Sequence, residues 1–185
     1  MDVLEAIQTR RSIRHFDPNY TIPKEDLHKI VDLTLLSPTA MNKQGIDLVV
    51  VTNRQKIDEA TEITFRSIDA RAQKRFIDRQ HESGVNNALS YDASCIIFLT
   101  ANERADPSFI GIDTGIMCMS IMAAARHYNY QAICLGILLA GNKNELEKLL
   151  GIGKDKLLMA VALGKPAESA KVLPKEQLCK AIYIE

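Results

Sequence analysis

Apolar residues recur at helical spacing in two segments near the start of the chain. The first segment follows Asp2, a residue type that caps helices, and predicts a helix that ends near Arg10 or Arg11. The second has Pro23 at its first-turn position and ends at the Ser-Pro pair at 37–38, because the residue before a proline leaves helical geometry. The apolar positions are Val3, Leu4 and Ile7 in the first helix and Leu27, Ile30, Val31 and Leu35 in the second.

Three short runs are apolar at nearly every position, which is the pattern of strands that are covered on both faces. These runs are 47–52, 94–100 and 157–164. The charged stretch 54–80 between the first two carries scattered apolar residues, so we expect it to be helical and mostly on the surface. Another short helix is expected after Asn142 or Asn144 as its cap, with Gly151 as its stop.

The segment 111–128 has a different pattern, because it is small or apolar on every side. It carries no charge between Asp113 and Arg126, which is typical of a helix that is buried all round. A domain of this size seldom covers one helix completely, so we predict an extensive two-fold dimer interface. The last residues, 180–185, alternate in the manner of a strand, and we expect them to add to the sheet of this chain or of its partner.

Composition and charge limit the classes of partner. At 185 residues, of which 46% are apolar and 25% charged, the chain is expected to form one globular domain over residues 1–185. Its 23 basic and 23 acidic residues cancel, which argues against nucleic acid as a partner. No apolar run reaches the roughly 18 to 20 residues that span a bilayer, so no membrane association is expected.

The cysteines and the first residues bear on metal binding and on the compartment. The cysteines have neither C-x-x-C spacing nor a histidine at metal-ligand distance, so we expect no metal site. They are Cys95, Cys118, Cys134 and Cys179. The opening "MDVLEAIQ" lacks the apolar stretch of a signal peptide, and we expect the protein in the reducing cytoplasm.

The stretch "RRSIRHF" concentrates positive charge in a chain of zero net charge. Arg10, Arg11 and Arg14 have only Asp17 as an acid nearby in the sequence. Guanidinium groups together with the hydroxyl of Ser12 match the oxygens of a phosphate, which favours a phosphate-bearing cofactor over the alternative of a solvated charged face.

A second candidate is "SPTAMNKQ", residues 37–44. One interpretation is a helix stop followed by a polar loop. The amides of Asn42 and Gln44, placed just before a buried strand, also suit the recognition of a planar heterocycle. No G-x-G-x-x-G follows a strand, so a Rossmann dinucleotide domain is disfavoured, and no Ser-His-Asp or Cys-His pattern supports a nucleophilic side chain.

These two stretches together resemble the nitroreductase-like FMN-dependent oxidoreductases. In that family a short helix is followed by Arg-Arg-Ser-x-Arg-x-Phe and, after another helix, by Ala/Ser-Pro-Ser/Thr-x-x-Asn-x-Gln. The segment "DTGIMCMSIMAAARHYNYQAICLG" and the endings "LGKP" and "LPKEQL" fit the rest of the family pattern. The resemblance covers nearly the whole chain and implies an α+β fold, with a central mixed or antiparallel sheet surrounded by helices, in an intertwined homodimer.

The resemblance also implies the residues of an FMN site, with no catalytic side chain and no metal. The FMN phosphate and ribityl chain would be held by Arg10, Arg11, Ser12 and Arg14. The isoalloxazine would be lined, from the other subunit, by Pro38, Thr39, Ala40, Met41 and Asn42. The backbone at Leu135 and Gly136 would face the flavin N5 edge, and Lys175, with Lys171 as the alternative, would add a cation near the phosphate.

The implied activity is transfer of a hydride from NAD(P)H through FMN to a small acceptor such as a nitroaromatic or a quinone, by a ping-pong mechanism. The alternatives are a non-catalytic protein that binds FMN for storage, sensing or transfer, and an unrelated anion-binding protein. The chain departs from the family at Gly45 and Ile46, where a proline and an aromatic residue are common, and around Tyr91-Asp92-Ala93. The acceptor and the choice between NADH and NADPH therefore stay open.

The stretch 65–80 is expected to form a helix or loop over the flavin. Four of its side chains could contact a ligand, and the alternative is that they only lie on the surface or pack in the core. They are Phe65, Arg71, Lys74 and Phe76.

Overall fold

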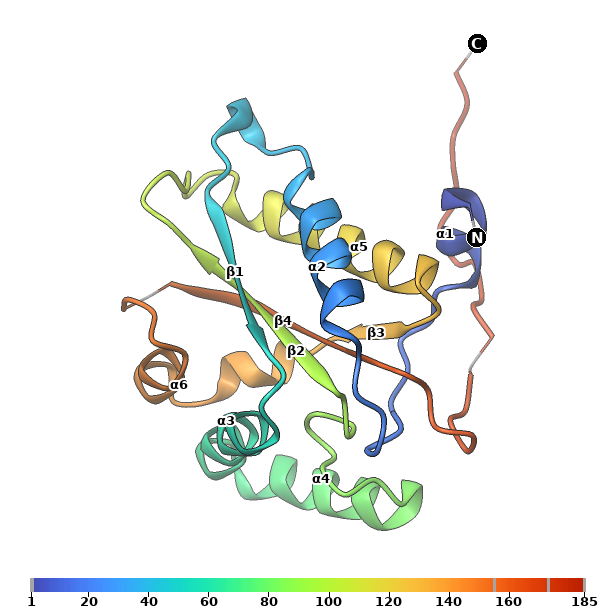
Figure 1. Cartoon of the computed structure of the whole chain (residues 1–185), viewed down its shortest axis with the longest axis vertical. Helices are drawn as coiled ribbons and strands as arrows, with labels where there is room; N and C mark the ends of the chain where they lie inside the picture. Colours follow the sequence, from blue (N-terminus) through green and yellow to red (C-terminus); the bar gives the residue numbers. More distant parts are fainter. Residues whose placement is uncertain (1, 155, 173, 185) are drawn as a thin grey trace.

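The computed structural model describes residues 2–154, 156–172 and 174–184, and its centre is a sheet of four strands (Figure 1). The strand order is β1-β2-β4-β3, and all neighbouring strands are antiparallel. The strands are β1 (Ile46–Val51), β2 (Cys95–Ala101), β3 (Gln131–Cys134) and β4 (Leu157–Gly164). The three apolar runs are thereby confirmed as strands, whereas β3 was not expected.

Helices cover both faces of this sheet, so the α+β fold is confirmed (Figure 1). On one face, alternate residues of β2 such as Ile97 and Leu99 pack with α2 (Lys24–Leu35) and α5 (Ile110–His127). On the other face, Ile96 and Phe98 pack with α3 (Arg54–Ser67), α6 (Lys143–Leu150) and the 3-10 helix η2 (Gly136–Ala140). The burial of both faces explains why β2 and β4 lack polar alternation, whereas β1 at the edge of the sheet is partly exposed.

Several helix ends follow the sequence signals. Asp2 caps α1 (Val3–Thr9) by accepting a hydrogen bond from the Glu5 N–H at 2.8 Å. Asn142 caps α6, and Gly151 ends it in the left-handed region at φ 69°. Pro23, in contrast, is the N-cap of α2 rather than a first-turn residue.

The charged stretch 54–80 is helical, as predicted, but it divides into α3 and α4 (Ala70–Ser83). Asp69 begins the second helix by accepting a hydrogen bond from the Ala72 N–H at 2.8 Å. The expected surface location holds for α4, which buries only Phe76. In α3 it holds for one side only, because Ile57 and Ile63 on the other side are buried against the sheet.

Two apolar surfaces of the chain are left uncovered. The helix α5 buries one face, yet Ile112 on the opposite face is 61% exposed, so a single chain does not cover this helix, as expected, and the dimer interface stays a prediction. The apolar face expected for α1 is also open, with Leu4 70% exposed. Both surfaces require another covering if they are to leave water.

The C-terminal segment is a third uncovered surface. Residues 180–184 form no strand with this chain's sheet, Ile182 is 88% exposed, and the segment leads away from the body of the molecule (Figure 1). Pairing of this segment with a partner's sheet stays a prediction, and Glu185 lies outside the described residues.

None of the helices in the described part of the chain is long and apolar enough to cross a membrane. Within the same residues, no three side chains of the metal-binding types lie together.

Candidate functional site

Residues 10–16, the arginine-rich segment, run in extended form along the edge of the sheet that β3 makes. Ser12 forms a parallel bridge with Ala132, and the Arg11 N–H donates to the Gln131 Oε1 at 3.1 Å. Ile13 is 1% exposed, which anchors the segment in the core, whereas Ser12 and Arg14 on either side of it point outward. This alternation presents a hydroxyl and a guanidinium on the same side, as expected of extended backbone.

The three arginines have different surroundings. The Arg10 Nε is buried and has no hydrogen-bond partner among the described residues. Arg11 instead folds back on the backbone, since its Nη1 donates to the carbonyl oxygens of Gln8 at 2.8 Å and Arg10 at 2.9 Å. A buried charged donor without an acceptor is costly, so the Arg10 environment fits an anionic group that completes it.

Beside this segment is a cavity of about 450 Å³ with three basic side chains and one acidic side chain. It is lined by Ser12, Arg14, His15, Arg79, Glu82, Ser83, Ser169 and Lys171. Lys171 thus lies with Arg14, whereas Lys175 belongs to the exposed C-terminal segment and is not among the described residues that line the cavity. The surplus of positive charge and the three serine hydroxyls suit a phosphate.

Backbone contacts bring the Lys171 segment to this place. The Ala167 N–H donates to the carbonyl of His15 at 3.1 Å, and the Ser169 Oγ lies 3.2 Å from the His15 Nδ1. The segment after β4 is therefore joined to the arginine-rich segment, and Lys171 follows two residues later.

Arg79 on α4 is a cavity residue that sequence reasoning missed. Its Nη1 donates to the Tyr91 hydroxyl at 2.9 Å, and its guanidinium lies 5.3 Å from the ring centre of Phe76 and 5.8 Å from that of Tyr91. The backbone of Tyr91 in turn accepts from the Phe16 N–H at 2.9 Å. The available signal was its spacing from Arg71 and Arg75, which repeats every four residues on one face of a helix.

The loop 38–44 is held in an unusual conformation at the start of α5. The Asp113 Oδ1 accepts from the Ala40 N–H at 3.1 Å, and the Thr39 Oγ1 accepts from the Gln44 N–H at 3.0 Å. Met41, Asn42 and Gln44 all have left-handed backbone, at φ 52°, 52° and 49°. Such strain persists where surrounding contacts impose it, and it is common at ligand sites.

In one chain this loop and the arginine-rich segment lie at opposite ends of α5. Asp113 binds the loop near the helix start, while the Arg126 Nε donates at 3.0 Å to the Thr9 Oγ1, next to Arg10. At 1.5 Å per residue, the two ends are about 20 Å apart. Pro38, Thr39, Ala40, Met41 and Asn42 are therefore not brought together with Arg10, Ser12 and Arg14 within a single chain.

Leu135 and Gly136 lie on the same side as the arginine-rich segment, because they follow β3 directly. The Leu135 N–H donates to the Ala160 carbonyl at 2.8 Å, and its side chain is only 1% exposed. Gly136 begins η2 and is exposed, with nothing within 4 Å of the place where a Cβ would stand. The first N–H groups of a helix lack intrahelical partners, so this end of η2 offers donors to a ligand.

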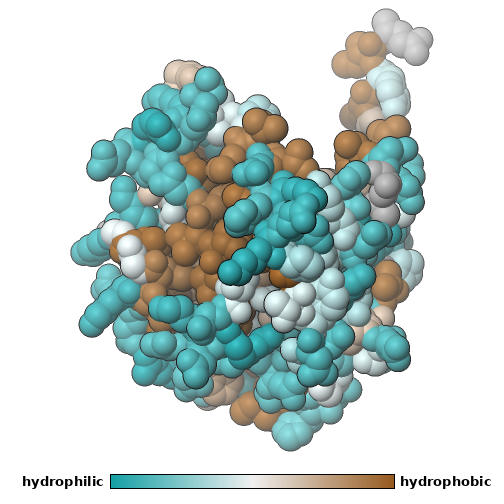
Figure 2. All heavy atoms as spheres, viewed as in Figure 1, coloured by the Kyte–Doolittle hydropathy of each residue, from teal (hydrophilic) through white to brown (hydrophobic). Residues whose placement is uncertain are grey.

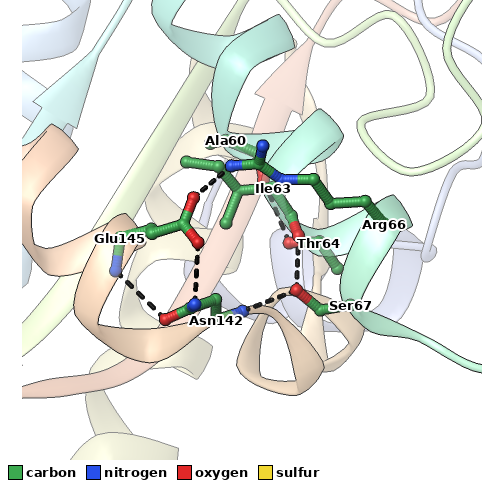
Figure 3. Close-up of polar contacts among 7 residues, drawn as sticks. All are labelled: Ala60, Ile63, Thr64, Arg66, Ser67, Asn142 and Glu145. Atoms are coloured by element: carbon green, nitrogen blue, oxygen red, sulfur yellow. Dashed lines mark hydrogen bonds and ion pairs between the residues drawn. The ribbon is translucent and has the colours of Figure 1, made fainter.

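The far end of η2 is fixed to α3 and α6 by a polar network (Figure 3). The Asn142 N–H donates to the Ser67 Oγ at 3.0 Å, and Arg66 forms an ion pair with Glu145. Gly141 is required there, because an added Cβ would lie 2.7 Å from the Thr64 Oγ1. The position of η2, and with it that of Gly136, is thus set at both ends.

The thiol of Cys134 reports the charge around Arg10. A hydrogen bond from Cys118 and the nearby Arg10 guanidinium lower the pKa of Cys134 to about 7, against the opposing effect of burial. The same hydrogen bond and burial raise the pKa of Cys118. The Arg10 guanidinium is thus close enough to the end of β3 to act on this thiol, although the hydrogen bond from Cys118 has the larger effect on its pKa.

Comparisons with known proteins agree over most of the chain. The model of the nitroreductase family matches residues 7–165. A relative from Lactiplantibacillus plantarum, "CLA biosynthesis enone reductase", is 26% identical, over 90% of this chain and 87% of its own length. A relative from Methanothermobacter thermautotrophicus, "Putative NADH dehydrogenase/NAD(P)H nitroreductase", is 28% identical, over 91% of this chain and 80% of its own length. A crystal structure of a nitroreductase with bound FMN from Desulfitobacterium hafniense has a TM-score of 0.83 at 25% identity, and the match covers 100% of both chains.

Proposed function

This chain belongs to the nitroreductase family, and on that premise we propose that it is an FMN-dependent oxidoreductase that takes electrons from NAD(P)H. The observation that carries the proposal is the buried Arg10 Nε without an acceptor, in the same extended segment whose Ser12 and Arg14 line a cavity together with Lys171. The phosphate of FMN would supply that acceptor. The similar proteins whose names mention bound FMN and NAD(P)H support the same assignment.

The residues of this chain would divide the tasks of binding and orientation. Arg10, Ser12, Arg14 and Lys171 would hold the FMN phosphate, and the Gly136 N–H would donate to the flavin at N5. When bound, FMN would supply the redox chemistry, namely transfer of a hydride at N5 from NAD(P)H to a small acceptor such as a nitroaromatic or a quinone in two alternating half-reactions. We propose Lys171 rather than Lys175 as the added cation, because Lys171 lines the cavity.

A two-fold homodimer would complete each site. If two copies pair α5 in antiparallel fashion through its uncovered face, the start of one α5 lies beside the end of the other. The loop 38–44 of one copy then meets the Arg10 to Arg14 segment of the second copy. Exposed Ile112 and the open apolar face of α1 support this arrangement, since both would be covered in the dimer.

The C-terminal segment would strengthen the same dimer. The outer edge of β1 is unpaired within the described residues, and apolar surface gathers over β1 and α2 (Figure 2), where Leu36 is 79% and Val50 38% exposed. We propose that the segment around Ile182 of each copy covers this face of the other. Burial of such surface contributes roughly 25 cal/mol per Å².

The proposal is tested on the purified protein after it has been saturated with FMN. We expect a yellow protein that NAD(P)H bleaches under anaerobic conditions and that a nitroaromatic or quinone restores to yellow. A protein that neither retains nor binds FMN would contradict the proposal. Retention of FMN without bleaching by either nicotinamide would instead favour the non-catalytic flavoprotein.

A further inference from the structure

The outer face of α4 carries a row of arginines that the proposed FMN site uses only at one end. Arg71, Arg75 and Arg79 follow one another at intervals of four residues, so they lie along one side of the helix. With Lys74, Asp78 and Glu82 they line a depression of about 400 Å³.

Most of the positive charge in this row is not neutralised within the chain. The Lys74 Nζ pairs with the Asp78 Oδ2 at 2.9 Å. No carboxylate lies within ion-pair distance of Arg71 or Arg75 anywhere in ranges 2–154, 156–172 and 174–184. Like charges four residues apart destabilise a helix, so the row is not explained by the stability of α4.

The row leads directly into the cavity beside the arginine-rich segment. Arg79 and Glu82 line both the depression on α4 and the cavity that contains Arg14 and Lys171. From Arg79 the row extends for about 12 Å along the helix to Arg71. Ile137, next to Gly136, packs against the cluster that contains Phe76 of α4, so a dinucleotide whose nicotinamide reaches a flavin at Gly136 would pass its phosphate-bearing end along this helix.

We infer that Arg71 and Arg75 bind the 2′-phosphate of the electron donor, and that the enzyme uses NADPH in preference to NADH. This inference rests on the proposed function, because it assigns the donor of that same site. The two donors differ only in the 2′-phosphate, and guanidinium groups without a carboxylate partner are suited to it.

The test compares the wild type with the double variant Arg71→Gln/Arg75→Gln. A matched control, Lys148→Gln/Lys154→Gln, removes the same charge from exposed positions on α6 and the turn after it. The first readout is kcat/KM of the FMN-loaded enzyme with NADPH and with NADH. We expect the wild type and the control to favour NADPH by about tenfold or more, and the double variant to lose most of that ratio through KM for NADPH.

The second readout needs no turnover: calorimetric binding of 2′-phospho-ADP-ribose and of ADP-ribose to the same three proteins. We expect the 2′-phosphorylated ligand to bind more tightly to the wild type and the control, and equally to its counterpart in the double variant. A wild type that does not distinguish the two ligands, or a double variant that still does, would overturn the inference. Discrimination in binding by a protein that NADPH never reduces would uphold the 2′-phosphate site and reject the proposed oxidoreductase.

Discussion

The arginine-rich segment and the loop 38–44 differ in how they relate to their own chain. Ile13 and the bridge from Ser12 to Ala132 attach the first to the core, and it faces a cavity built by the same chain. The loop is held at its base by Asp113, yet Met41 at its tip is 68% exposed. The arginine-rich segment thus lies in a cavity that its own chain forms, whereas the tip of the loop 38–44 has few contacts with its own chain and is available to another surface.

This difference explains why a single chain looks incomplete. The two regions are separated along α5, and one face of the same helix is uncovered; the proposed second copy would account for both.

The largest loss of free energy is expected when the arginines proposed to bind the FMN phosphate are replaced. The double variant Arg10→Ala/Arg14→Ala should weaken FMN binding by about 3 to 6 kcal/mol, because each charge-assisted contact contributes about 1.5 to 3 kcal/mol. Titration of FMN fluorescence measures this loss. Arg11→Ala is the matched control, since its guanidinium is already bonded to backbone carbonyls, and it should change the affinity far less. Equal losses in the two variants would contradict the assignment of Arg10 and Arg14.

A smaller change, in the stability of the fold, is expected at Gly141, where η2 contacts α3 and α6. Gly141→Ala should destabilise the fold by about 1 to 3 kcal/mol, because the new methyl group would collide with Thr64 and Leu146. The comparison is Gly136→Ala, for which the space is open and the expected change is within about 0.5 kcal/mol. Denaturant unfolding of both variants gives the two values, and a tolerated Gly141→Ala would mean that η2 is not fixed at this end.

The smallest effect concerns the ionisation of Cys134. Its pKa is lowered from 9.0 to about 7, so the thiolate that reacts with a thiol reagent should appear as the pH rises through about 7. In a Cys179→Ser background, which removes the exposed thiol, Cys118→Ala should move this midpoint upward, and Arg10→Ala should move it upward by less. A midpoint near 9 without any substitution would show that neither the hydrogen bond from Cys118 nor the Arg10 guanidinium lowers the pKa of Cys134.

Local signals in the sequence were sufficient for much of the fold. Asp2, Asn142 and Gly151 act at helix ends because their effects depend on adjacent backbone alone. The apolar runs of β2 and β4 could be identified because a strand that is buried on both faces is apolar at nearly every position. The strand β3 was missed since four residues, QAIC, are too few to display a period, and pairing with β4 decides its conformation.

The candidate site was less predictable because long-range contacts build it. Arg79 reads as a surface residue of a charged helix until Tyr91 and the cavity are in place. The choice between Lys171 and Lys175 depends on where the segment after β4 meets His15, and no local pattern encodes that contact. Arg11 matches the family motif, yet its guanidinium is engaged by its own backbone.

The most direct test of a site shared between two chains is subunit complementation. Chains with Arg10→Ala/Arg14→Ala and chains with Asn42→Trp, which places bulk on the exposed loop, are refolded together, and FMN bound per heterodimer is measured. If each site combines the phosphate side of one chain with the loop of the other, the heterodimer has one site without substitutions and should bind one FMN with wild-type affinity. Heterodimers that bind no better than the two variant homodimers would contradict the shared site.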